Sequence, residues 1–161
     1  MTQKTMPENF ASAVLFILDE TFDNVHGVYL DKNTSLFETL ATISAEEASR
    51  PVSATCATLA AQVAHVAFYL DTTRRFVTGE LGEGVRVDWG EIWRTVREVT
   101  PEEWEASKQH LRDSYNSIIE LVKTTPDFNN EDVIGGTIGV IVHTAYHLGE
   151  IRQALCTLKS S

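Results

Sequence analysis

Two histidines lie four residues apart in the apolar segment 141–152, which reads IVHTAYHLGEIR and stands near the C-terminus. Residues at this spacing share one face of an α-helix, one turn above each other. Because the neighbouring residues are mostly apolar, we expect the face that carries His143 and His147 to point into the protein. The segment therefore predicts a last helix that brings two imidazoles into the interior of an all-α protein.

A third imidazole, His65, stands in the middle of an earlier apolar helix. Two imidazoles one turn apart can hold one metal ion, and His65 would supply a third ligand from a second helix. The residues alone leave two interpretations open, because such a pair also arises by chance and a buried histidine often serves packing only. A helical metalloprotease is disfavoured, since Thr144 stands where that motif requires glutamate.

The last-helix segment HTAYHLGEIR, from His143 to Arg152, is similar to a motif of the DinB/YfiT-like superfamily of metalloenzymes, whose usual form is H-x-x-Y/H-H-L/R-G-Q-I/L. Residues 58–66, TLAAQVAHV, resemble the second helix of that family, which carries the other ligand. Residues 35–40 and 44–47 resemble the end of its first helix and the turn after it, so the resemblance covers residues 34–158. Glu150 departs from the usual glutamine. It places a carboxylate within a turn of His147 and is a candidate catalytic residue.

The resemblance implies an all-α four-helix bundle that runs up-down-down-up, with a long crossover between helices 2 and 3. It also implies His65, His143 and His147 as metal ligands, and a homodimer.

Loop length supports the topology independently. A second helix of ~24 residues spans about 36 Å, and the crossover to a parallel neighbour must return over that length. Residues 80–100 can reach ~65 Å when extended, whereas the other two connections are shorter.

Apolar residues at helical spacing, together with capping residues and breakers, predict the course of the chain. Residues 1–6 are expected to form a loose tail in a single domain that covers residues 1–161. The following segments are expected in order: a first helix from Pro7 that breaks near His26 and resumes near Lys32, a capped turn at 44–50, a second helix from 53–55 to 78, a third helix from Thr100 and Pro101, and a fourth helix from 130–132.

Six residues are candidates for a substrate pocket between these helices: His26, Gln62, Tyr69, Trp89, Trp93 and Tyr146. Gln62 and Tyr69 share the face of His65, which is less apolar than the rest of the second helix yet carries almost no charge. For His26 a solvent-facing loop position is the favoured alternative. For the two tryptophans of the crossover the favoured alternative is a cover over one end of the core. Gly136 and Gly139 precede His143 by two turns and one turn, and would let another helix or a ligand approach closely.

The composition excludes several classes of partner. The formal net charge is −10, so the basic footprint of a nucleic-acid-binding protein is missing and an anionic membrane is disfavoured. The family name refers to a DNA-damage response, but this charge argues against direct contact with DNA. Two cysteines, Cys56 and Cys156, do not make a disulfide scaffold. No signal peptide and no apolar run of ~20 residues stand out, so we expect a cytoplasmic protein.

Three neutral imidazoles leave an open position on a metal ion, which is typical of a catalytic site, because structural zinc sites close all four positions. Water there becomes more acidic and a thiol becomes a thiolate, so hydrolysis and thiol transfer are both open. Imidazole alone does not choose among Zn, Ni, Fe and Mn. Characterised relatives include thiol-dependent transferases and isomerases, so the resemblance implies a low-molecular-weight thiol and a small-molecule substrate. The rival hypothesis is a non-catalytic bundle that binds a ligand or partner.

Overall fold

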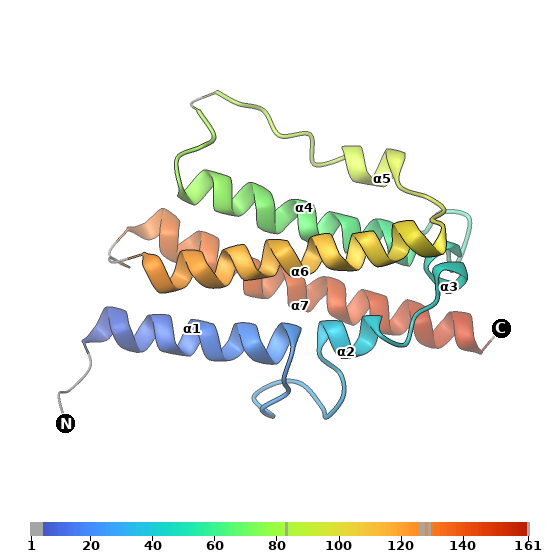
Figure 1. Cartoon of the computed structure of the whole chain (residues 1–161), viewed down its shortest axis with the longest axis horizontal. Coiled ribbons are helices and arrows are strands. Elements are labelled where there is room, and N and C mark those ends of the chain that lie inside the picture. The colour runs from blue at the N-terminus through green and yellow to red at the C-terminus, as the bar shows by residue number, and fades with distance from the viewer. Residues whose placement is uncertain (1–4, 83, 126–127, 129, 161) are drawn as a thin grey trace.

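The computed structural model describes residues 5–82, 84–125, 128 and 130–160. Every regular element in these ranges is helical, and none is a strand, so the prediction of an all-α protein is confirmed. Four long helices lie side by side in Figure 1, and three short ones join them. The helices are α1 (Met6–Phe22), α2 (Leu36–Leu40), α3 (Ala45–Ser49), α4 (Leu59–Val77), α5 (Glu91–Thr95), α6 (Pro101–Thr124) and α7 (Glu131–Lys159).

The starts of the helices follow from local capping. The hydroxyl of Thr100 accepts a hydrogen bond from the backbone N–H of Glu103, and Pro101 occupies the first turn of α6, as the sequence predicts. Thr5 caps α1 in the same way, so the helix begins at Met6. The expected tail is therefore shorter than residues 1–6, and its first four residues lie outside the described part of the chain.

Helix α4 starts later than the sequence pattern suggests. Thr58 is its N-cap, with a hydroxyl that accepts from the N–H of Ala61, whereas residues 53–56 form a turn. The hydroxyl of Ser53 lies 3.2 Å from that of Thr55 and 3.2 Å from the thiol of Cys56. Serine and threonine side chains of this kind stabilise a turn as readily as a helix start, so composition did not reveal which threonine caps the helix.

The break that was expected near His26 covers residues 23–35, so the helix resumes at Leu36 and not near Lys32. Glu20 anchors this segment. Its side chain is fully buried and accepts four backbone hydrogen bonds, from His26 at 3.2 Å, Val28 at 3.0 Å, Tyr29 at 2.7 Å and Leu30 at 2.8 Å. Burial raises the pKa of this carboxyl, but the four N–H groups lower it more, so the pKa lies below its usual value. The loop is therefore anchored to the end of α1.

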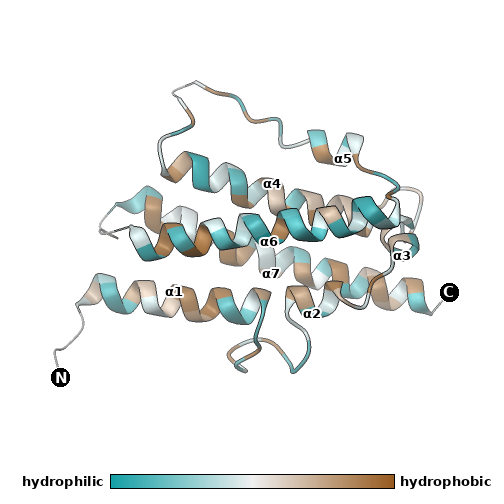
Figure 2. Ribbon diagram, viewed as in Figure 1, coloured by the Kyte–Doolittle hydropathy of each residue, from teal (hydrophilic) through white to brown (hydrophobic). Residues whose placement is uncertain are grey.

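The core lies between the four long helices, whose apolar faces turn inward in Figure 2. Helix α4 packs against both α6 and α7, and α1 packs against the same two helices. Helix α6 buries a stripe of residues at helical spacing: Trp104, Leu111, Tyr115, Ile118 and Val122. The indole N–H of Trp104 donates to the carbonyl of Ile43 at 2.8 Å, which ties α6 to the segment between α2 and α3.

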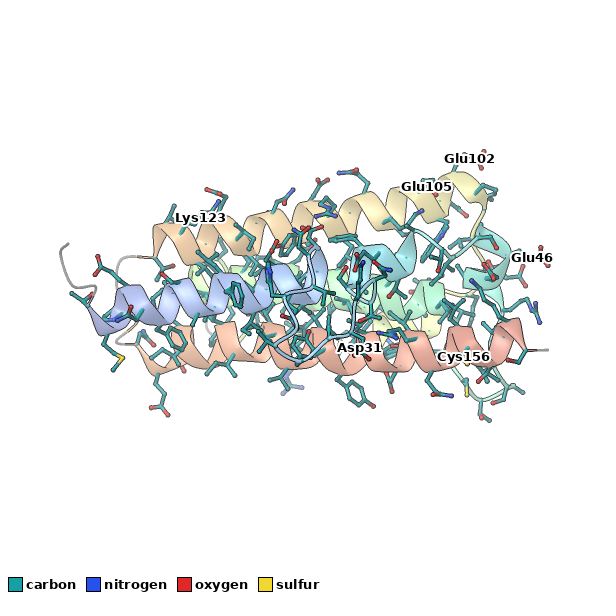
Figure 3. The ribbon with its side chains drawn as sticks, turned by 90° about the horizontal axis from the view of Figure 1, so that it is seen from below. Asp31, Glu46, Glu102, Glu105, Lys123 and Cys156 are labelled. Atoms are coloured by element: carbon teal, nitrogen blue, oxygen red, sulfur yellow. The ribbon has the colours of Figure 1, made fainter. Side chains whose placement is uncertain are left out.

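The chain between α4 and α6 crosses one face of the bundle and contains α5. In Figure 1 both α4 and α6 start at the end of the molecule where α3 lies and run to the other end, so this connection travels back along the bundle. In Figure 3 the labelled side chains of Glu102, Glu105 and Lys123 lie along the outer side of α6. Cys56 and Cys156 are exposed, free thiols. Within the described ranges, no helix has the length and apolarity that a membrane span requires.

Candidate metal centre

Helices α4 and α7 bring three histidines together, as the sequence predicts. His65 comes from α4, and His143 and His147 come from successive turns of α7, with one ring nitrogen of each within 4.8 Å of the others. The Nε2 atoms of His65 and His143 are 3.1 Å apart. Two nitrogens on one tetrahedral ion lie ~3.3 Å apart when each bond is about 2.0–2.1 Å. The Nε2 atoms of His65 and His143 therefore stand at the spacing of two metal ligands, and the three residues form a group that could hold an ion.

The orientation of His147 is fixed by two oxygen acceptors. Its Nδ1–H donates to Oε1 of Gln62 at 2.6 Å and lies 2.9 Å from Oε2 of Glu150. Because both partners are acceptors, the proton belongs on Nδ1, and Nε2 keeps a free lone pair. This arrangement is the usual support for a metal-binding histidine, in which an outer partner fixes the tautomer of the ring.

Aromatic packing orients the other two rings. The ring of Tyr69 stacks on His143 with a centroid distance of 3.7 Å and an interplanar angle of 8°. Trp93 lies over His65 with ring centroids 4.3 Å apart, and its centroid is 6.1 Å from that of His147. The Nδ1 atoms of His65 and His143 are buried and have no partner among the described residues. Apart from the contact between their Nε2 atoms, aromatic packing therefore holds these two imidazoles.

The environment keeps all three imidazoles neutral at physiological pH. Burial is the main reason that the pKa of His143 falls to about 3 and that of His65 to about 4, and repulsion from the neighbouring histidines adds to it. The pKa of His147 also lies below its usual value because of burial, although Glu150 acts in the opposite direction. Neutral rings have lone pairs available, so the donor set fits a divalent metal ion.

Gln62 and Glu150 both support His147. Gln62, a candidate for the substrate pocket, turns its amide oxygen to the ring of His147. Glu150, the candidate catalytic residue, pairs with Nδ1 on the ring edge opposite to Nε2, so it positions the imidazole. Tyr146 is 63% exposed and its ring lies 5.1 Å from that of His147. A hydrogen bond to Glu150 raises the pKa of Tyr146, which ties the tyrosine to the same carboxylate.

The crossover tryptophans do not cover an end of the core, which was the favoured interpretation. Trp93 lies on the histidine cluster, and Trp89 is 44% exposed and contacts the rings of Phe68 and Tyr69, each at 5.7 Å. The other interpretation, in which these residues wall a pocket beside the cluster, fits their positions. The reason is that the crossover runs along α4 instead of ending over the core.

His26 lies apart from the cluster. Its Nε2 is 2.7 Å from Oδ2 of Asp19, its ring stacks on Phe16 at 4.3 Å, and no contact joins it to the three histidines in the described part of the chain. The assignment of His26 to a substrate pocket stays a prediction. Glu20 anchors the backbone of the loop that carries His26 and leaves the imidazole beside α1.

Thr144, which stands between the two histidines of α7, was considered only as the residue that replaces the glutamate of a metalloprotease motif. Its side chain is fully buried, and its hydroxyl has no hydrogen-bond partner among the described residues. The role of Gln62 was accessible from spacing, because it precedes His65 by three residues on the same helical face. Gly139 was singled out correctly, since a Cβ there would lie 2.9 Å from the hydroxyl oxygen of Tyr69.

Comparison of the chain with protein-family models, curated proteins and solved structures finds no match. The function of the chain is therefore inferred from the site itself.

Proposed function

We propose that this protein is a metal-dependent enzyme of the DinB/YfiT type that acts on a small molecule by hydrolysis or by thiol transfer. The observation that carries the proposal is the convergence of His65, His143 and His147, with Nε2 of His65 and His143 3.1 Å apart. Three neutral imidazoles leave a position open on a bound ion, which distinguishes catalytic from structural sites.

The ligands of the proposed ion are the Nε2 atoms of the three histidines, and the candidates are Zn, Ni, Fe and Mn. When bound, such an ion lowers the pKa of a water molecule or of a low-molecular-weight thiol. Gln62 and Glu150 hold the tautomer of His147, and Trp93 shields His65 from solvent. Glu150 is thus a positioning residue in this proposal.

The proposed fold is the up-down-down-up bundle of that superfamily. Helix α4 packs against α6, and Figure 1 draws the two helices running in the same direction, joined by the long connection that contains α5. A parallel pair of adjacent helices needs such a crossover, whereas antiparallel neighbours are joined by short loops.

Metal analysis tests the proposal. The purified protein is expected to hold about one equivalent of a divalent metal, because three converging imidazoles bind tightly. The variants His65→Ala and His143→Ala are expected to lose it. His110→Ala is the matched control, since His110 is an exposed histidine that pairs with Asp71 at 2.9 Å on the outside of the bundle. Absence of metal under every loading condition would contradict the enzyme proposal and favour a non-catalytic binding protein.

The reaction class is tested by a screen with low-molecular-weight thiols and electrophiles. Thiol transfer predicts turnover only when both reactants are present, whereas hydrolysis predicts turnover of the electrophile alone. In either case the His65→Ala variant is expected to be inactive, and His110→Ala is expected to keep its activity.

We also propose a homodimer. The apolar residues of the first helix, which include Phe10, Leu15 and Leu18, spread around it, and Phe16 is 48% exposed. Light scattering at micromolar concentration is expected to give twice the mass of 17.9 kDa. A monomer mass would refute this part of the proposal without affecting the metal centre.

A further inference from the structure

A cavity of about 480 Å³ adjoins the histidine cluster at Tyr69. Its walls come from the second half of α4, from the connection that follows α4, and from the start of α7, and they include Thr73, Phe76, Val85 and Gly136. Tyr69 lines this cavity and also stacks on His143 at 3.7 Å. The cavity and the cluster therefore share one aromatic side chain.

The walls of this cavity carry no charge among the residues described. The larger hollow between α4 and α6, of about 820 Å³, is lined by charged side chains that include Asp71, Arg75 and Glu120. Around the smaller cavity, apolar side chains remain exposed instead, with Phe76 at 57%, Val85 at 56% and Trp89 at 44%. An uncharged apolar group that enters this space gains from burial, whereas a charged group loses its hydration.

Hydroxyl groups line the floor of the same cavity. The side chains of Tyr69, Thr72 and Thr73 make no hydrogen bond to the described residues, although Thr72 is buried. Gly136 also lines the cavity, and α7 approaches α4 closely at this point, because a Cβ there would lie 3.3 Å from Cγ2 of Val77 and 3.4 Å from Cγ2 of Thr73. An uncharged polar atom attached to an apolar group would therefore find partners that the protein itself leaves free.

We propose that this cavity binds an uncharged aryl or branched-alkyl group of a small molecule whose reactive end lies at the three histidines. The inference rests on the proposed function and adds to it the chemical class of the substrate. The volume falls within the usual range of small-molecule sites, roughly 300–1,000 Å³. Tyr69 then separates the bound apolar group from His143 by the thickness of one ring.

The test uses 4-fluorobenzyl alcohol, a neutral aryl probe with one hydroxyl, and follows its ¹⁹F signal with metal-free full-length protein. We expect saturable binding that Val85→Asp weakens at least about tenfold, because it places a carboxylate in the wall. Val28→Asp is the matched control, since Val28 is also 56% exposed and lies in a loop away from the cavity. Circular dichroism checks that both variants are folded.

A second readout locates the bound probe. The imidazole ¹⁵N resonances of His143 are expected to shift on addition of the probe, because Tyr69 transmits the change in packing, whereas those of exposed His110 stay in place. Equal binding by Val85→Asp and wild type, or binding that leaves His143 unchanged, would overturn the inference. A third result would also overturn the inference. If the probe shows no saturable binding and Val85→Asp dissociates a dimer, this surface is the contact with a second copy of the chain.

The two proposals fail in distinguishable ways. Absence of metal would refute the metalloenzyme and would leave the binding of the probe to metal-free protein intact. Absence of probe binding would refute the proposal that the cavity binds an uncharged apolar group, and the metal content of the protein would be unchanged.

Discussion

Oε1 of Gln62 lies 2.6 Å from Nδ1 of His147, so a side chain of α4 fixes a ring of α7 across the interface that holds the histidine cluster. The glutamine stands three residues before His65 on the same helix. One turn of α4 thus supplies both a candidate ligand and the support of another.

Replacement of Gln62 by leucine is expected to weaken metal binding about 10- to 100-fold, because His147 loses one acceptor for its Nδ1–H. Competition with a chelator of known affinity measures the change. Gln62→Glu keeps an oxygen acceptor and should lose less. Gln109→Leu is the control, since the side chain of Gln109 donates to Asp113 on the exposed side of α6. Equal affinities in Gln62→Leu and Gln109→Leu would show that the contact does not support the site.

Gly139→Ala is expected to weaken metal binding through Tyr69. Its new Cβ would lie 2.9 Å from the hydroxyl oxygen of Tyr69, which pushes the ring off His143. Removal of that hydroxyl should relieve the collision, so the double variant with Tyr69→Phe should recover affinity, as titration calorimetry can measure. Gly135→Ala meets no atom within 4 Å and should stabilise the helix by about 0.5–1 kcal/mol. Failure of the double variant to recover would contradict the assignment of Tyr69.

Glu20→Gln is expected to lower the free energy of unfolding by about 2–4 kcal/mol at pH 7, since it removes the charge from a buried carboxylate that accepts four backbone N–H groups. The folded-state pKa of Glu20 lies below 4.5, so its stabilising effect is present above pH 4.5 and is lost as the pH falls through the folded value. The difference between wild type and variant should therefore shrink below pH 4.5 in urea titrations.

The control for that experiment is Glu120→Gln, which removes one partner of an exposed pair with Lys123. It should change the unfolding free energy by no more than about 0.5 kcal/mol. A Glu20→Gln protein as stable as this control at pH 7 would contradict the anchoring role of Glu20.

Removal of metal by a chelator is expected to lower the melting temperature, because a ligand that binds only the folded state stabilises it. Zn²⁺ added to the metal-free protein should restore the original midpoint in differential scanning calorimetry. His110→Ala should respond as wild type does, and His65→Ala should not respond. A midpoint unaffected by metal in the wild type would argue against a three-histidine site.

The predictions from sequence were most accurate where the signal is local. Thr100 and Pro101 predict the start of α6, and in the structure Thr100 is the N-cap and Pro101 is the first residue of the helix. The meeting of His65 with the pair on α7 was predicted because all three stand in the middle of apolar helices. Helical spacing alone then restricts which way such side chains can point.

Contacts that depend on irregular backbone were not predictable. The partners of Glu20 are backbone N–H groups six to ten residues away. Because nearly every residue has a backbone N–H, the sequence does not show which of them Glu20 binds. Trp93 contacts His65 from the long crossover. The spacing of apolar residues does not predict the path of an irregular connection of that length. The cavity beside Tyr69 was missed for the same reason, since the crossover supplies one wall.

His65 and His143 are 78 residues apart in the chain, and this separation sets when the site can exist during synthesis. A ribosome that adds about 5–20 residues per second needs roughly 4–16 s to pass from the first of these histidines to the second. Throughout that interval a nascent chain can offer only one imidazole of the three. Loading with metal in the proposed geometry must therefore follow the emergence of α7, and a translation product that stops before α7 would carry no usable site.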